Sequence, residues 1–144
     1  AAHVVLLYAT SCAHRDLHAF PTRRSSDLLK EQPEVPTALF MHHPPFEVTT
    51  SKYPFQFDDK ALADTFLELI ASHKQIVHLF CGHAHRAFSV DLPTCVATVS
   101  PSLPPDNRLG EFEDALKNQP LYQLHRWDAA DKRFDTTTVA ATLR

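Results

Sequence analysis

Four of the ten histidines in the chain follow two short apolar stretches that have the composition of buried strands. His42 and His43 follow the first stretch, and His83 and His85 follow the second. Neutral imidazole is the commonest metal ligand that a protein offers. Because residues i and i+2 of an extended segment project to one side about 6.5–7 Å apart, His83 and His85 are expected to address two adjacent metal ions. We expect His42 to complete the cluster from the neighbouring strand end.

The apolar stretches are expected to be strands that end where the histidines begin. Residues 37–41 are closed by Pro44 and Pro45, which cannot donate to a strand ladder. Residues 76–81 form the second run, and Gly82 is expected to let the backbone turn tightly so that both following imidazoles aim inward. Ligands of α/β proteins bind at the carboxyl ends of strands. The sequence therefore predicts a binding site at this edge of a sheet.

Periodicity predicts the elements that surround these two strands. One helix is expected between them, with an aspartate cap at Asp58 or Asp59 and an apolar face at Leu62, Phe66, Leu69 and Ile70. The alternating aromatics Tyr53, Phe55 and Phe57 favour a half-buried strand over a platform for a nucleobase. Further strands are expected at residues 4–8, 87–91, 94–100, 121–127 and 134–141.

The paired histidine segments carry a resemblance to a known family. The stretch FMHHPPF, followed by a helix and then by HLFCGHAHR, resembles the last two signature blocks of the calcineurin-like metallophosphoesterases. The HHPP form is similar to the bacterial class III cyclic-nucleotide phosphodiesterases and their glycerophosphodiesterase relatives, and the resemblance covers about residues 29 to 138. It implies an α/β (α+β) fold of the αββα sandwich type, present here mainly as its carboxyl-terminal half.

The resemblance also implies roles for the histidines. His42 and His83 would bind one metal ion and His85 the other, with His43 a neighbour rather than a ligand. Two ions of iron, manganese or zinc would clamp a phosphodiester and activate a bridging water for attack. The implied substrate is a 3′,5′-cyclic nucleotide, with a glycerophosphodiester as the alternative. No catalytic side chain and no substrate-binding residue is assigned.

Earlier blocks of that family's pattern are missing from this chain. Gly82 and Gly110 are its only glycines and neither precedes Asp or Asn, so the Gly-Asp and Gly-Asn-His blocks are absent. Asp16 and His18 have the spacing of the first block, but we set them aside because they lie about two dozen residues before His42. We therefore expect at most one weakly held ion in this chain. A non-catalytic metal-binding or interaction fragment is the competing function.

One segment has the sequence of a foreign insertion. Residues 18–28, HAFPTRRSSDL, resemble the conceptual translation of a sequencing-library adapter, which has Ser in place of Ala19. The expected organisation is a remnant strand in residues 1–10, a foreign segment in residues 11–28, and the carboxyl-terminal half of one metallophosphoesterase domain in residues 29–144. Because the chain begins at Ala1 and not at Met, we expect a piece of a longer protein.

Composition limits the partners. With 14 basic and 17 acidic residues the net charge is −3, which gives no electrostatic basis for binding a nucleic acid polymer. No apolar run approaches the roughly 20 residues of a membrane span, so no membrane partner is expected. Three cysteines favour a reducing cytoplasm, and Cys81 is interpreted as a small buried hydrophobe and not as a zinc ligand with Cys95. The intact parent could form a homodimer.

Overall fold

A five-stranded sheet lies at the centre of the chain in its computed structural model, which describes residues 3–4, 22–55, 57 and 59–141. The strand order is β1-β2-β3-β5-β4. Strands β1, β2, β3 and β5 are parallel, and β4 is antiparallel to β5. Their bounds are β1 His3–Val4, β2 Thr37–Phe40, β3 Ile76–Cys81, β4 Phe88–Asp91 and β5 Val96–Val99.

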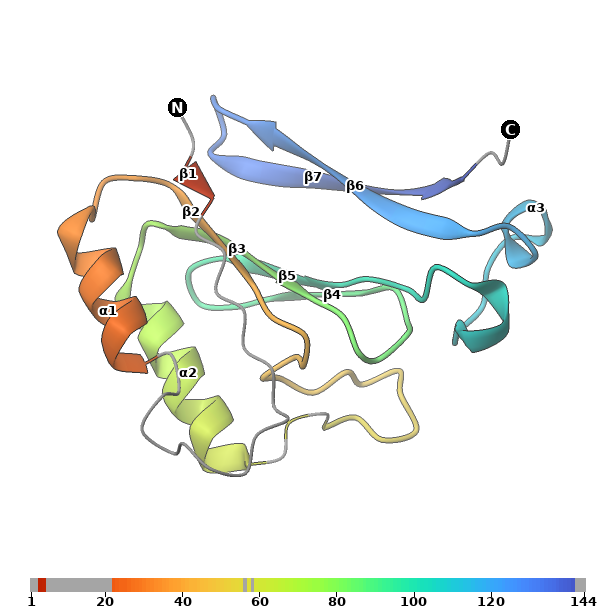
Figure 1. Ribbon diagram of the computed structural model, residues 1–144, viewed down its shortest axis with the longest axis horizontal. Helices are drawn as coiled ribbons and strands as arrows, with labels where there is room; N and C mark the ends of the chain where they lie inside the picture. The colour runs from red at the N-terminus through yellow and green to blue at the C-terminus, as the bar shows by residue number, and fades with distance from the viewer. Residues whose placement is uncertain (1–2, 5–21, 56, 58, 142–144) are drawn as a thin grey trace.

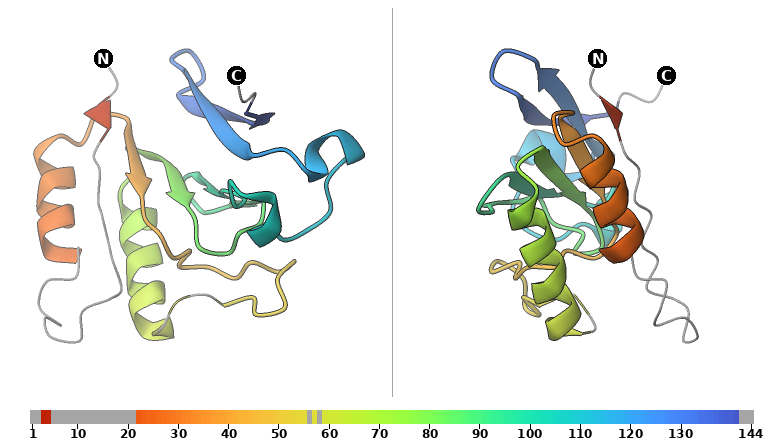
Figure 2. Two further views of the ribbon diagram at one scale, coloured as in Figure 1. Left: turned by 45° about the vertical axis from the view of Figure 1, so that its right-hand side comes forward. Right: turned by 90° about the vertical axis from the view of Figure 1, so that its left-hand side faces the viewer.

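Different layers cover the two faces of this sheet. Helices α1 (Thr22–Glu31) and α2 (Lys60–Ser72) lie on one face (Figure 1). The antiparallel hairpin of β6 (Leu121–Asp128) and β7 (Arg133–Ala140) lies on the other, as the turned views in Figure 2 also show. The short helices η1 (Pro105–Asn107) and α3 (Asp114–Lys117) lie in the connection from β5 to β6. This mixed arrangement of helices and sheets confirms the predicted α/β (α+β) class.

Helix α2 forms as the sequence predicts. The carboxylate of Asp59 accepts hydrogen bonds from the backbone N–H groups of Ala61 and Leu62, which have no partner within the first turn of a helix. Phe66 and Ile70, on the predicted apolar face, are buried against the sheet. None of the described helices is both long enough and apolar enough to cross a membrane.

Alternation along β3 divides its side chains between the two faces of the sheet. Leu79 and Cys81 belong to the apolar core on the helical face. His78 and Phe80 point toward the hairpin, where the ring of Phe80 lies 4.2 Å from that of His125, centroid to centroid. The principal core residues are Leu29, Leu39, Phe66, Ile70, Ile76, Leu79, Ala97 and Val99.

Some predicted elements differ in the structure or lie outside the described residues. The strand expected around Tyr53 and Phe55 is wrong: Phe55 makes one isolated bridge with Glu47, and Tyr53 is 69% exposed. Helix α1 is not among the predicted elements, and residues 22–27, which belong to the segment interpreted as foreign, form most of it. Of the strand predicted at residues 4–8, only Val4 is described; residues 5–8, like Cys12, Asp16 and His18, lie outside the described residues.

The two described cysteines are buried thiols. Cys81 lies in β3, and Cys95 immediately precedes β5. Burial raises the pKa of the Cys81 thiol, and it raises that of Cys95 to about 11. Both thiols are therefore neutral near pH 7, and the interpretation of Cys81 as a small buried hydrophobe is confirmed.

Candidate metal centre

The two histidine turns are adjacent because their strands are parallel neighbours. Phe40 at the end of β2 is in register with Phe80 near the end of β3. Backbone hydrogen bonds continue past the strands, from Met41 N–H to the Phe80 carbonyl and from Gly82 N–H to the His42 carbonyl, each 2.9 Å long. These bonds fix the first turn against the second. The two histidine turns therefore lie side by side at the carboxyl edge of the sheet.

Gly82 lies next to the imidazole of His42. A Cβ at this position would lie 3.4 Å from Nδ1 of His42 and 3.7 Å from its carbonyl oxygen. Both distances are those of ordinary van der Waals contact, so a small side chain would also fit at this position. The sequence predicted a tight backbone turn at Gly82. The positive φ angles instead belong to His83 (63°) and His85 (54°).

The left-handed backbone conformation of His83 and His85 changes the directions in which their side chains project. An alternating geometry would aim His83 and His85 to one side, but that expectation requires an extended segment. The Ala84 N–H instead donates to the Gly82 carbonyl at 2.7 Å, which closes a tight turn. Few residues other than glycine adopt positive φ, and histidine is among those enriched there. The two rings consequently have different partners.

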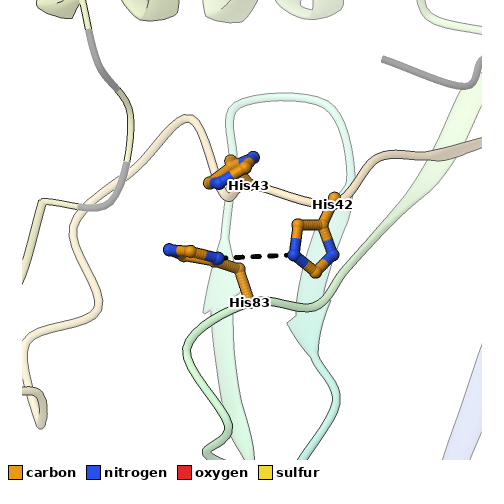
Figure 3. Close-up of side chains that lie close together, drawn as sticks. All are labelled: His42, His43 and His83. Atoms are coloured by element: carbon orange, nitrogen blue, oxygen red, sulfur yellow. Dashed lines mark hydrogen bonds between the residues drawn. The ribbon is translucent and has the colours of Figure 1, made fainter. Parts of the chain in front are cut away.

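Three imidazoles gather at the edge of the sheet. Nδ1 of His83 lies 3.3 Å from Nε2 of His42 (Figure 3). The ring of His43 lies 4.0 Å from that of His83 and 4.8 Å from that of His42, centroid to centroid. One ligand atom from each residue falls within 4.8 Å of the others. His42 and His83 are exposed and His43 is half-buried, so solutes can reach the group.

The spacing of the nitrogens fits a metal ion. Nitrogen ligands lie 2.0–2.1 Å from zinc, which makes the edge of a tetrahedral site about 3.3–3.4 Å. The observed 3.3 Å between His42 and His83 matches this edge. Three protein ligands with an open fourth position are typical of catalytic zinc sites. The His42–His83 pair therefore has the spacing of two ligands of one ion, while the full group of three spans up to 4.8 Å, and no carboxylate joins it among the described residues.

His85 lies outside this group. Its Nδ1 is 3.0 Å from the Asn107 carbonyl, and its own carbonyl accepts a hydrogen bond from the Leu109 N–H. The structure thus brings together two of the three predicted ligands, His42 and His83, and adds His43. His43 lies between His42 and the buried Pro44, where the chain cannot continue as a strand. This position is the feature of the sequence that could have indicated His43 as a member of the group.

The other described histidines have their own partners. His78 is 2% exposed, and its Nε2 lies 3.1 Å from the hydroxyl of Thr98. Burial lowers the pKa of His78 to about 4, with the nearby charge of His125 adding to the effect. Burial also lowers the pKa of His125, whose Nδ1 lies 2.8 Å from the Thr136 hydroxyl. Both imidazoles are therefore neutral at pH 7.

Comparison with known proteins points to phosphodiesterases. No family model matches the chain. It is 44% identical over 55 residues, 37% of this chain and 20% of the relative, to a Synechococcus protein named "Probable cyclic nucleotide phosphodiesterase". It is 27% identical over 106 residues, 69% of this chain and 37% of the relative, to an Arcobacter nitrofigilis protein named "Probable glycerophosphodiester phosphodiesterase GpdQ".

Both relatives are named as phosphodiesterases, but their names state different substrates. The matched part of the chain spans about a fifth of the first relative and just over a third of the second. The similarity therefore supports the class of phosphodiester hydrolases. It does not separate a cyclic nucleotide from a glycerophosphodiester.

Proposed function

We propose that the chain is part of a metal-dependent phosphodiesterase and carries the histidine ligands of its metal site. The observation that carries this proposal is the 3.3 Å separation of His42 and His83 nitrogens from two neighbouring strand ends. The similarity to two proteins named as phosphodiesterases supports the reaction class. On this proposal, residues 29–144 are the carboxyl-terminal half of one domain, residues 1–10 are a remnant strand and residues 11–28 are foreign.

The proposed ligand set divides between two ions. His42 and His83 hold the first ion, and His43 supplies a third imidazole to it. His85 serves a second ion only together with carboxylates from upstream residues of a longer parent, because its ring is engaged with Asn107 in this chain. Imidazole ligands suit zinc and iron, and added carboxylates suit manganese. This chain alone therefore holds at most one ion, weakly.

The chemistry follows from this arrangement. A bound divalent cation supplies Lewis-acid charge for a phosphate oxygen and lowers the pKa of a coordinated water. The residues of the chain would hold that charge at a solvent-accessible sheet edge, and the backbone hydrogen bonds of Met41 and Gly82 keep the two histidine turns side by side. Arg86 adds a permanent positive charge in the second turn, and its buried Nε has no hydrogen-bond partner among the described residues.

Calorimetric titration with Zn²⁺ or Mn²⁺ tests the ion site directly. We expect one ion per chain, and we expect His83→Ala to weaken binding at least about tenfold. His73→Ala is the matched control, since His73 lies at the end of α2 and bonds to the Leu69 carbonyl. Equal affinity in wild type and His83→Ala would contradict the site.

A second pair of variants separates the roles of His43 and His85. We expect His43→Ala to weaken ion binding by this chain and His85→Ala to leave it unchanged. In a longer protein with its natural upstream residues, we expect His85→Ala and a chelator each to abolish hydrolysis of bis(p-nitrophenyl) phosphate. Full activity in that variant would refute a dinuclear site.

The substrate proposed first is a 3′,5′-cyclic nucleotide, and the second is a glycerophosphodiester; relative rates with the two decide between them. The proposed setting is the cytoplasm, with no membrane and no nucleic acid polymer as partner, and with a homodimer as a possible form of the parent. If this chain binds one ion and the longer protein shows no turnover, a non-catalytic metal-binding role replaces hydrolysis.

A further inference from the structure

The turn that contains His85 is attached to the connection between β5 and β6, which carries η1 and α3 (Figure 1). Nδ1 of His85 lies 3.0 Å from the Asn107 carbonyl oxygen, and the Leu109 N–H donates to the His85 carbonyl at 2.9 Å. These two bonds join the side chain and the backbone of one residue to the same short segment. Residues 107–109 therefore hold both the turn and the ring that projects from it.

The bond to Asn107 decides where the hydrogen of the imidazole lies. A carbonyl oxygen can only accept a hydrogen bond, so Nδ1 of His85 must carry the hydrogen. In a neutral imidazole the lone pair that can bind a cation then belongs to Nε2. His85 is exposed, and none of the described residues forms a hydrogen bond with its Nε2. Histidines that bind metals almost always donate their other ring N–H in this way, often to a backbone carbonyl.

Arg108 anchors the segment that holds His85. Its guanidinium donates to the carbonyls of Leu116 and Lys117, at 3.1 and 2.7 Å. These carbonyls lie in the last turn of α3, where helical partners are missing. A third bond, 2.9 Å long, goes to the Gln119 carbonyl. Because the planar guanidinium offers several donors in a fixed geometry, this one side chain connects the segment to the end of α3.

Gly110 restricts the other end of the segment. Its φ angle is 102°, a conformation that residues with a side chain rarely adopt. A Cβ at this position would lie 3.6 Å from a terminal nitrogen of Arg86, which is an ordinary contact. The backbone angle, and not a lack of space, is therefore what favours glycine here. Residues 107–110 are thus held by three side-chain bonds of Arg108 and by a backbone turn at Gly110.

We propose that residues 107–110, anchored by Arg108, position the imidazole of His85: they hold it as the Nδ1–H tautomer and so present the Nε2 lone pair to a cation. Arg108 is a positioning residue, because it acts through the segment and not on the ion. The use of this lone pair by a second ion rests on the proposed function. The tautomer itself does not, because it follows from a hydrogen bond within the chain.

Nitrogen-15 NMR of the metal-free chain tests the tautomer directly. Protonated and unprotonated ring nitrogens have well-separated chemical shifts, and the rings are neutral above about pH 8, well above the ordinary histidine pKa. The signals that are missing from His85→Ala identify those of His85. We expect Nδ1 to be protonated and Nε2 unprotonated. A His85 ring with its hydrogen on Nε2 in the wild-type chain would overturn the inference.

Arg108→Met tests the anchor. We expect the share of the Nδ1–H form of His85 to fall about twofold, because both tautomers of a neutral imidazole form when no acceptor selects one. Arg108→Lys keeps the charge without the planar fork, and we expect it to restore the share only in part. Arg126→Met is the matched control, because Arg126 is exposed on β6. If Arg108→Met loses stability but keeps the wild-type tautomer, its role is structural only and the assignment of Arg108 is wrong.

Gly110→Ala tests the same segment with Arg108 in place, and it serves if Arg108→Met does not fold. An alanine is strained at a φ of 102°, so we expect the segment to shift and the share of the Nδ1–H form to fall here as well. A folded Gly110→Ala chain with the wild-type tautomer would contradict the positioning of His85 by this segment.

Titration with Zn²⁺ separates this inference from the proposed function. His83→Ala removes a ligand of the first ion, and we expect it to weaken Zn²⁺ binding while the His85 tautomer is retained. If the wild-type chain binds no Zn²⁺ but shows the Nδ1–H form, the proposed metal site is wrong and the positioning of His85 stands. If Zn²⁺ binds and Nε2 of the metal-free chain carries the hydrogen, only the positioning of His85 is wrong.

Discussion

The two faces of the central sheet are built from the same strands but are filled differently. On the helical face, Leu79 and Val99 have no exposed surface and pack in a continuous apolar core with α2. On the hairpin face, His78 and Thr98 form a buried polar pair beside a cavity of about 420 Å³. Apolar packing that stabilises the fold is thus concentrated on one side. The other side holds titratable groups and space next to the candidate metal centre.

Truncating the helical face is expected to have the largest effect on stability. Leu79→Ala removes a fully buried side chain from the core, and we expect the free energy of unfolding to fall by about 2–5 kcal/mol. Leu124→Ala is the matched control, because Leu124 lies on the outer side of the hairpin and is 49% exposed. We expect its effect to stay within about 0.5 kcal/mol. Urea unfolding followed by circular dichroism measures both; similar losses would contradict the contrast.

Lowering the pH is expected to act through the hairpin face. The pKa of His78 is about 4 in the folded chain, below its ordinary value of 6.5, so the unfolded chain binds more protons between these values. The contribution of His78 to the free energy of unfolding is therefore fully present above pH 6.5. It falls by up to about 3 kcal/mol as the pH drops toward 4.

Chemical unfolding at a series of pH values measures this loss. We expect His78→Gln to remove most of the slope in this range, although burial also lowers the pKa of His125 and leaves a smaller slope. Cys81 and Cys95 on the helical side contribute none, because their thiols are neutral throughout this range. An unchanged slope in His78→Gln would show that another group is responsible.

The smallest expected effect is at the exposed start of α2. Asp59→Ala removes the carboxylate that accepts from Ala61 and Leu62, and we expect a loss of about 1 kcal/mol. Asp64→Ala, in the same helix, removes only an exposed ion pair with Lys60 and is expected to change the melting temperature very little. Thermal melts of both variants make the comparison, and an equal shift in the two would argue against capping as the cause.

Elements with strong periodicity were predictable from the sequence. The strand at residues 76–81 has the predicted bounds, because six apolar or half-apolar residues end at a glycine. Helix α2 has its predicted cap at Asp59 and buries Phe66 and Ile70 from the predicted face. In these segments, local pattern and tertiary packing favour the same structure.

The parts that depend on distant contacts were not predictable. Helix α1 has little apolar pattern, and it is held by features such as the buried Leu29 and the bond from the Gln75 amide to the Leu29 carbonyl. In the candidate site, residue types indicated a cluster at two strand ends. Which imidazoles meet depends on the backbone angles of His83 and His85, and spacing along the sequence carries no information on those angles.

The left-handed backbone at His83 and His85 narrows the choice of residue at both positions. Glycine, asparagine, aspartate and histidine tolerate this conformation, whereas β-branched and bulky residues do so rarely. Apart from glycine, these tolerant residues all carry metal-binding atoms. A mutational scan of this turn would therefore find ligand-type side chains less destabilising than β-branched ones, so selection for a stable turn would by itself enrich the sheet edge in groups that bind cations.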